Sequence, residues 1–209
     1  MPALKSNPMP WVGVDMFYWA PLVSDKAPAG ATPGATTYGA AQRVPGLTNV
    51  SFTANSQTGS YYADNGVYAT AAQLGELGLA VQSADIPPEL RAEWFQYDYE
   101  DGVLNEAQIN PIEMAVGYRR KRSDGSYRYV WLLKVKPGMS DEATATQNDS
   151  IAFQDGTTNF APEMRISDGL YRRTLDDDDP ALPEDVTPEV IAANWFTDPN
   201  WDPAEYEEE

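Results

Sequence analysis

The chain contains 209 residues, enough for one domain with a sizeable core plus extensions, because domains usually contain about 100 to 200 residues. Cysteine and histidine are both absent, so disulfides, thiolate metal sites and Ser-His or Cys-His nucleophiles cannot form, and the commonest general base is missing. The formal net charge is -18, but residues 176–209 hold 13 of the 32 acidic residues and no lysine or arginine, which leaves the body only mildly acidic.

The N-terminal part predicts one strand and one long loop. The sequence MPALKSNPMPW lacks the apolar run of a secretory signal, and no stretch approaches the roughly 20 apolar residues of a transmembrane helix, so we expect a soluble, unprocessed protein. Residues 11–22 are rich in β-branched and aromatic side chains and predict a strand that Pro21 ends. Residues 24–46 mix Ala, Pro, Gly and Thr without an apolar period and predict a long loop, a kind of segment that is usually functional or disordered.

Two further strands are expected between residues 48 and 81. Residues 48–57 and 73–81 predict strands that flank a polar segment, with turn signals at Thr58-Gly59 and Asn65-Gly66. In the second strand, apolar and small residues alternate, which is typical of a half-buried strand.

One helix is expected in the body. Residues 87–95 predict a short helix, with Asp85 as its cap, prolines in its first turn, and Leu90 and Trp94 as an apolar pair one turn apart. We expect it to pack on a sheet. Residues 103–108 predict a brief strand.

Residues 115–136, with the sequence AVGYRRKRSDGSYRYVWLLKVK, predict a hairpin with its turn at Asp124-Gly125. Side chains alternate along a strand, so one face of the second arm carries Tyr127, Tyr129, Trp131, Leu133 and Val135, and the other carries Arg128, Val130, Leu132, Lys134 and Lys136. The second of these faces is charged at its ends and apolar in its middle. We therefore expect it to be partly covered, against another subunit.

The last strands of the body are expected at residues 142–153 and 157–166, separated by a turn at Asp155-Gly156. Pro162 favours an edge strand or a bulge for the second of them. A turn at Asp168-Gly169 leads into residues 170–173.

An acidic extension is expected after Leu175. The run Asp176 to Asp179 has the charge of a divalent-cation site, but a bare acidic run without a glycine-containing loop is more typical of a solvated linker, which is the interpretation that we favour. Residues 187–196 predict a short helix. The tail aromatics Trp195, Phe196 and Trp201 predict either docking on the exterior of a subunit assembly or self-packing of a short helix.

Many strands, one helix in the body and long loops predict an all-β sandwich or barrel with a short flanking α-helix, long loops and an acidic C-terminal extension. The expected division is a β domain over residues 1–175 and an acidic tail over residues 176–209.

Three stretches carry a resemblance to a known family. They are YYADNGVYATAAQLGELGLAVQSADIPPELRAEWF at 61–95, PIEMAVGYRRKRSDGSYRYVWLLKVKPG at 111–138 and TATQNDSIAFQDGTTNFAPEMRISDGLYR at 144–172. In this order they resemble the major tail proteins, or tail tube proteins, of long, flexible-tailed bacteriophages. The similarity covers most of residues 11–173, and the tail after Leu175 lies outside the shared pattern.

The resemblance implies a structural virion protein, made in the host bacterial cytoplasm, whose subunits close into homohexameric rings. These rings stack into the hollow tail tube through which phage DNA passes. Implied partners are further copies of the chain and the tape measure, terminator and distal tail proteins, with no membrane, no cofactor and no catalytic site. Another ring-forming tail protein of the same fold, a tail terminator or distal tail protein, is the alternative, and a carbohydrate-binding β module is a more distant one.

Candidate contacts between subunits or rings are taken from the loop and the hairpin. They are Pro28, Gly30, Pro33, Tyr38, Arg119, Arg120, Lys121, Arg122 and Trp131. The basic run at 119–122 could touch DNA phosphates or be a solvated hairpin tip. We favour pairing with carboxylates of a neighbouring subunit or ring, including those of the acidic tail.

A negative lumen would keep DNA from adhering to the tube wall, and Asp15, Glu106 and Glu113 are the lumen candidates. Pairs such as Glu89 with Glu93 resemble glycosidase carboxylates, but nothing in the sequence builds a cleft around them, so we expect no enzyme. Tyr61, Tyr62 and Tyr68 fit either a stacking platform for single-stranded nucleic acid or sugar, or packing in a core or an interface.

Overall fold

The computed structural model describes residues 8–63, 65–141, 146 and 154–206. Its described strands are β1 (Trp11–Lys26), β2 (Ala35–Tyr38), β3 (Gln42–Val44), β4 (Leu47–Ala63), β5 (Gly66–Ser83), β6 (Asp98–Glu100), β7 (Val103–Asn105), β8 (Met114–Arg122), β9 (Tyr127–Asp141), β10 (Gly156–Pro162) and β11 (Arg172–Asp176). The helices are α1 (Pro88–Phe95) and α2 (Pro188–Asn194), and a 3-10 turn covers Pro203–Glu205. The prediction of an all-β fold with a short flanking helix is confirmed.

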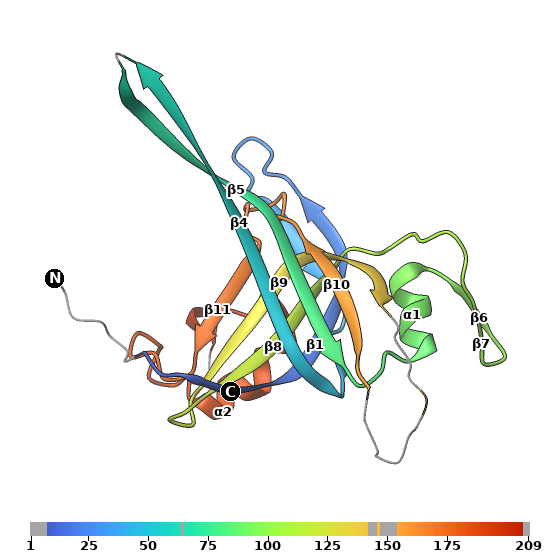
Figure 1. Cartoon of the computed structure of the whole chain (residues 1–209). Helices are drawn as coiled ribbons and strands as arrows, with labels where there is room; N and C mark the ends of the chain where they lie inside the picture. The colour runs from blue at the N-terminus through green and yellow to red at the C-terminus, as the bar shows by residue number, and fades with distance from the viewer. Residues whose placement is uncertain (1–7, 64, 142–145, 147–153, 207–209) are drawn as a thin grey trace.

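One antiparallel sheet contains most of these strands, in the order β2-β1-β8-β9-β10-β5-β4, with β3 beside β1 and β11 beside β9. The sheet is strongly curved (Figure 1). In a flat sheet, β1 and β10 would lie roughly 14 Å apart, because two strands separate them and neighbours are about 4.8 Å apart. The rings of Phe17 in β1 and Phe160 in β10 are nevertheless 6.3 Å apart between centroids. The sheet therefore curls around a core.

This first core fills the concave side of the sheet and is closed by α1. Trp94 of α1 is buried and makes edge contacts with Phe17 and Phe160, at centroid distances of 6.5 and 5.6 Å. The helix begins after Pro87, which has no side-chain cap, so the prediction that Asp85 caps it is wrong. Consecutive prolines already hold the φ angle that a first helical turn needs, and no capping side chain is used.

A second core lies on the opposite face of β8 and β9. Tyr129, Trp131 and Leu133 of β9 pack there against residues from the C-terminal segment. Their partners from that segment are Leu175, Val186, Ile191, Trp195 and Phe196. The predicted helix at 187–196 is confirmed as α2, which Thr187 caps by accepting a hydrogen bond from the Val190 amide.

Strand β9 is thus covered on both faces by its own chain. Val130 and Leu132, which were expected against another subunit, belong to the first core, so that expectation is wrong. The pairing of β8 with β9 has a bulge between the pairs Met114–Val135 and Val116–Leu132. Because of this bulge, the side chain of Val135 also points into the first core.

The predicted end of the first strand and the predicted loop differ from the structure. Strand β1 runs through Pro21 to Lys26. On the edge away from β8, β1 pairs with β3 before Pro21 and with β2 after it. The missing N–H of this proline therefore removes no hydrogen bond between strands. The interpretation of residues 24–46 as one long loop is wrong, because β2 and β3 lie within it.

Four further predictions concern the strands that follow. The turn at Thr58-Gly59 is wrong, because β4 continues through both residues, whereas the turn at Asn65-Gly66 is confirmed. Strand β10 lies between β9 and β5 and Pro162 is its last residue, so the edge-strand interpretation is wrong. The strand expected at 142–153 lies outside the described residues except for residue 146, which is in no strand.

Candidate assembly surface

The most unusual feature of the molecule is the length of β4 and β5, which contain 17 and 18 residues. Strands in globular proteins usually contain about 5 or 6 residues. Strand β10 pairs with β5 only from Leu79 to Ser83, so the described residues of 54–74 have strand partners only within β4 and β5. We call this two-stranded projection, residues 54–74, the arm, and it extends well away from the body (Figure 1). Ten residues of strand give it a reach of about 30 Å.

The arm has no core of its own. All its described side chains are exposed, including Tyr61 at 66%, Val67 at 56% and Tyr68 at 75%. The rings of Tyr61 and Tyr68 meet edge to face near the tip, with centroids 6.3 Å apart. A lone two-stranded hairpin is at best marginally stable in water, so the arm is built to be stabilised by something outside this chain.

The charge and the backbone pairing of the arm also indicate that it is stabilised by another molecule. Between residues 47 and 75 the sequence has a single charged residue, Asp64, which is not among the described residues. Along 54–74, neither outer edge of the arm has a strand partner in the described part of the chain. Proteins commonly protect such edges with charges, prolines or bulges. The arm has register shifts between Ala54 and Ser56 and between Tyr61 and Tyr62, but it has no proline and a single charged residue, so its open edges are a template for pairing with another chain.

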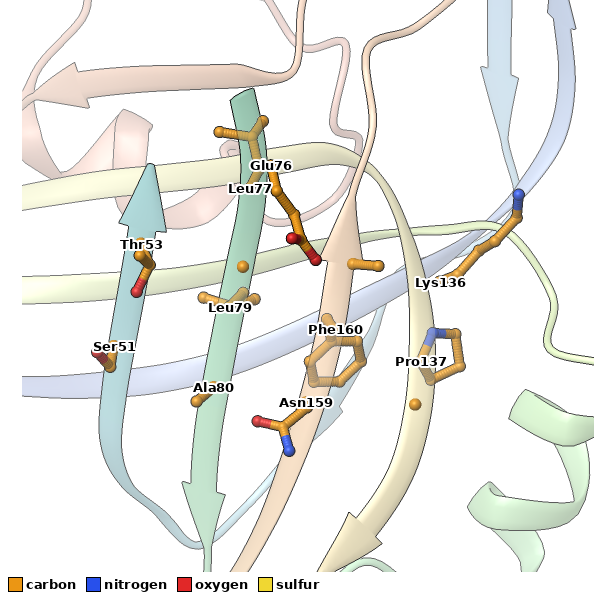
Figure 2. Close-up of a pocket in the computed structure, with 13 residues that line it drawn as sticks. Ser51, Thr53, Glu76, Leu77, Leu79, Ala80, Lys136, Pro137, Asn159 and Phe160 are labelled. Carbon is orange, nitrogen blue, oxygen red and sulfur yellow. The ribbon is translucent and has the colours of Figure 1, made fainter. Parts of the chain in front are cut away.

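A shallow hollow of about 450 Å³ lies at the base of the arm, where β4, β5, β10 and β9 run side by side (Figure 2). We call it the trough. Its lining is dominated by small side chains and is made of Ser51, Thr53, Glu76, Leu77, Gly78, Leu79, Ala80, Lys136, Pro137, Gly138, Asn159, Phe160 and Ala161. Ala80 faces away from the first core, because its neighbours Leu79 and Val81 face into it.

The contact residues expected in the loop have different surroundings. Pro28, Gly30 and Pro33 are exposed in the turn between β1 and β2. Tyr38 is half-buried, and its hydroxyl donates a hydrogen bond of 2.6 Å to the Leu133 carbonyl. Burial raises the pKa of Tyr38 to about 12, despite a hydrogen bond from Arg165 that lowers it. The role of these residues in subunit contacts stays a prediction.

Two of the four basic residues in the run pair with carboxylates of their own chain. Arg119 makes two hydrogen bonds to Asp15, of 2.9 and 2.7 Å. Arg122 is buried and binds Asp176 and, at 2.6 Å, Asp178. The acidic tail supplies these two partners within the same chain, and pairing of the run with a neighbouring subunit or ring stays a prediction.

The remaining basic residues of the run are less engaged. Arg120 lies over the ring of Trp11, with its guanidinium carbon 4.6 Å from the centroid, and Lys121 is exposed. Trp131, the last contact candidate, is fully buried beneath the C-terminal segment, and its indole donates to the Trp195 carbonyl at 2.8 Å. Its side chain presents no surface to a neighbouring molecule.

The first residue of the acidic run is part of the folded body. The side chain of Asp176 is 14% exposed and also pairs with Arg128, at 2.5 Å. Burial alone would raise the pKa of Asp176, but the hydrogen bonds and charges of Arg128 and Arg122 outweigh it and lower that pKa. The interpretation of this run as a solvated linker is therefore wrong at Asp176. Trp195 and Phe196 likewise dock on the sheet of their own chain.

Each lumen candidate has a basic partner. Asp15 pairs with Arg119, Glu106 with Arg91 at 2.8 Å, and Glu113 with Lys134 at 3.3 Å. Glu113 also binds Lys136 at 3.2 Å. Because these carboxylates are neutralised, they would contribute little field to a lumen. Which surface faces a lumen stays a prediction.

Residues with catalytic or metal-binding chemistry are sparse. Among the described residues, no group of three or more acidic side chains is arranged to hold a metal ion. Glu89 is exposed and accepts a hydrogen bond of 2.9 Å from Tyr99, on the open surface of α1. No helix of the described part is long and apolar enough to cross a membrane.

Sequence reasoning missed the arm as an assembly element. Its signal was present in the near absence of charge from residue 47 to 75, combined with β-forming residues on both sides of Asn65-Gly66. The polar residues between the two predicted strands instead suggested an interruption.

No protein-family model matches the chain, and no curated protein is significantly similar to it in sequence. A similar solved structure is that of an extracellular contractile injection system, the PVC sheath-tube complex in its extended state. The alignment has a TM-score of 0.44 and 10% identity and covers 80% of this chain and 91% of that chain. A likeness this weak carries no argument about function.

Proposed function

We propose that this chain is a structural virion protein that assembles into stacked homohexameric rings, forming the hollow tail tube through which phage DNA passes. The order of segments that resembles the major tail proteins supports this proposal, as does a curved sheet with an open edge at β4. Its work is mechanical, without catalysis or a cofactor. The tape measure, terminator and distal tail proteins are its proposed partners within the virion.

The single observation that carries the proposal is the arm. A two-stranded extension of about 30 Å, with exposed tyrosines and with Asp64 as the one charged residue in its sequence, is stable only when its faces and edges are covered. Identical copies can supply that cover in a closed ring, because every subunit then both offers and receives the same element.

Negative-stain electron microscopy of the purified protein tests the proposal. The sharpest variant deletes residues 57–60 together with residues 70–73, which are paired across the arm. Removing four pairs shortens the arm by about 13 Å and keeps each remaining side chain on its original face, because the strand period is two. We expect hollow filaments of uniform width for the intact chain and none for the variant, with an unchanged free energy of unfolding.

The outcomes separate the alternatives. Isolated rings from the intact chain would favour a tail terminator or distal tail protein. A chain that stays monomeric at all concentrations, or a shortened variant that still forms normal tubes, would contradict the proposal.

A further inference from the structure

We propose that the trough receives the arm tip of a second copy, with Tyr61 and Tyr68 as the inserted side chains. This inference rests on the proposed function, and it names the surface that completes the assembly contact.

The occupant must come from another molecule. The trough includes Gly78 and Ala80, and the tip includes Tyr68, on the same continuous strand β5. Ten residues of extended strand separate Tyr68 from Gly78 by about 30 Å, so a chain cannot place its own tip in its own trough. A second copy carries the same tip at the end of an arm that projects clear of its body (Figure 1).

The shape of the trough suits aromatic rings. Its floor is formed by residues with little or no side chain: Gly78 and Ala80 of β5, Gly138 of β9 and Ala161 of β10. A Cβ at Gly78 would meet only the Thr53 Cβ, at 4.0 Å, so the sheet surface above this glycine is open. Rings can lie flat on such bare backbone, and a tyrosine brings about 150 to 250 Å² of surface to bury there.

The polar groups of the trough suit tyrosine in particular. Lys136 already pairs with Glu113 and Glu163, each at 3.2 Å, and its charge is neutralised. Glu76 is exposed at the rim and forms no ion pair within the described residues (Figure 2). A tyrosine hydroxyl can donate a hydrogen bond to this carboxylate while its ring lies on the apolar floor. An aromatic tip that carries hydroxyl groups therefore fits the floor and the rim together.

Blocking variants test the pairing. Ala161 is exposed on the floor, and Ala161→Trp should fill the trough without disturbing either core. Ala107→Trp, at another exposed alanine that lies away from the trough, is the matched control. We expect Ala161→Trp and the double variant Tyr61→Ala, Tyr68→Ala each to raise the critical concentration for assembly about tenfold or more, as for aromatic hot spots. The control should assemble like the intact chain.

Cross-linking locates the contact directly, because the chain has no cysteine of its own. A Val67→Cys variant mixed with a Thr53→Cys variant should give a dimer with a short bismaleimide, and Val67→Cys mixed with Ala107→Cys should not. Assembly lost in the tip variant but normal in Ala161→Trp, without the cross-link, would overturn the trough assignment and leave the proposed function standing. Failure of the intact chain to assemble would overturn both.

Discussion

Replacing Gly117 with alanine is expected to destabilise the fold, because this glycine lies directly beneath the indole of Trp131. An alanine Cβ at this position would come 2.8 Å from Cε3 of that indole and 2.9 Å from two further ring atoms. Trp131 is fully buried, and its indole N–H is held by the Trp195 carbonyl. The ring therefore cannot move aside without disturbing the second core.

The magnitude follows from two opposing effects. Overpacking a dense core costs about 1 to 3 kcal/mol. Replacing a glycine by alanine returns about 0.4 to 1 kcal/mol through the lower entropy of the unfolded chain. We expect a net loss of about 1 to 2 kcal/mol for Gly117→Ala. Gly13→Ala is the matched control in the neighbouring strand β1, where nothing lies within 4 Å of the new Cβ, and it should be neutral or slightly stabilising.

Urea denaturation followed by tryptophan fluorescence measures the difference. A double variant that also carries Trp131→Phe should lose less than the sum of its single variants, because the smaller ring leaves room for the new methyl group. Equal stability of the Gly117→Ala and Gly13→Ala proteins would refute the packing of Trp131 on the strand beneath it.

Three further predictions concern the C-terminal segment and the arm. Asp176→Asn should lower the free energy of unfolding by about 2 to 3 kcal/mol at neutral pH, because it leaves buried Arg122 with a weaker partner. The folded pKa of Asp176 is lowered, so its stabilisation is present at neutral pH and lost as pH falls through that pKa. An acid titration of urea midpoints should show a smaller loss in Asp176→Asn, and an unchanged slope would contradict this. Trp195→Ala should cost about 3 to 5 kcal/mol and expose the C-terminal segment to protease, whereas Ala193→Ser on the exposed side of α2 should change neither. Assembly through the arm, whose sequence has Asp64 as its one charged residue, should change little between about 0.05 and 0.5 M sodium chloride in light scattering; a steep decline would indicate a contact between charges instead.

Elements defined by neighbouring residues were predictable from the sequence. The turn of the β8 and β9 hairpin needs a residue at positive φ, which Gly125 supplies at +97°. Helix α2 follows from Thr187 and the proline after it.

The two main errors have a common physical origin. Trp131 looked like an interface residue because its cover, Trp195, lies 64 residues further along the chain, and no local pattern records that pairing. The sequence predicts a polar segment between two strands in place of the arm, because a strand without a buried face shows no alternation of apolar residues.

The late position of the C-terminal segment has a consequence for synthesis. At about 5 to 20 residues per second, a ribosome needs roughly 3 to 13 seconds to translate the 64 residues between Trp131 and Trp195. During that interval the C-terminal segment does not yet cover the face of β9 that carries Tyr129, Trp131 and Leu133. Nascent chains and truncated products therefore expose an apolar surface that chaperones can bind. Chains stalled near residue 180 should accordingly capture a hydrophobic dye that chains released after residue 206 do not.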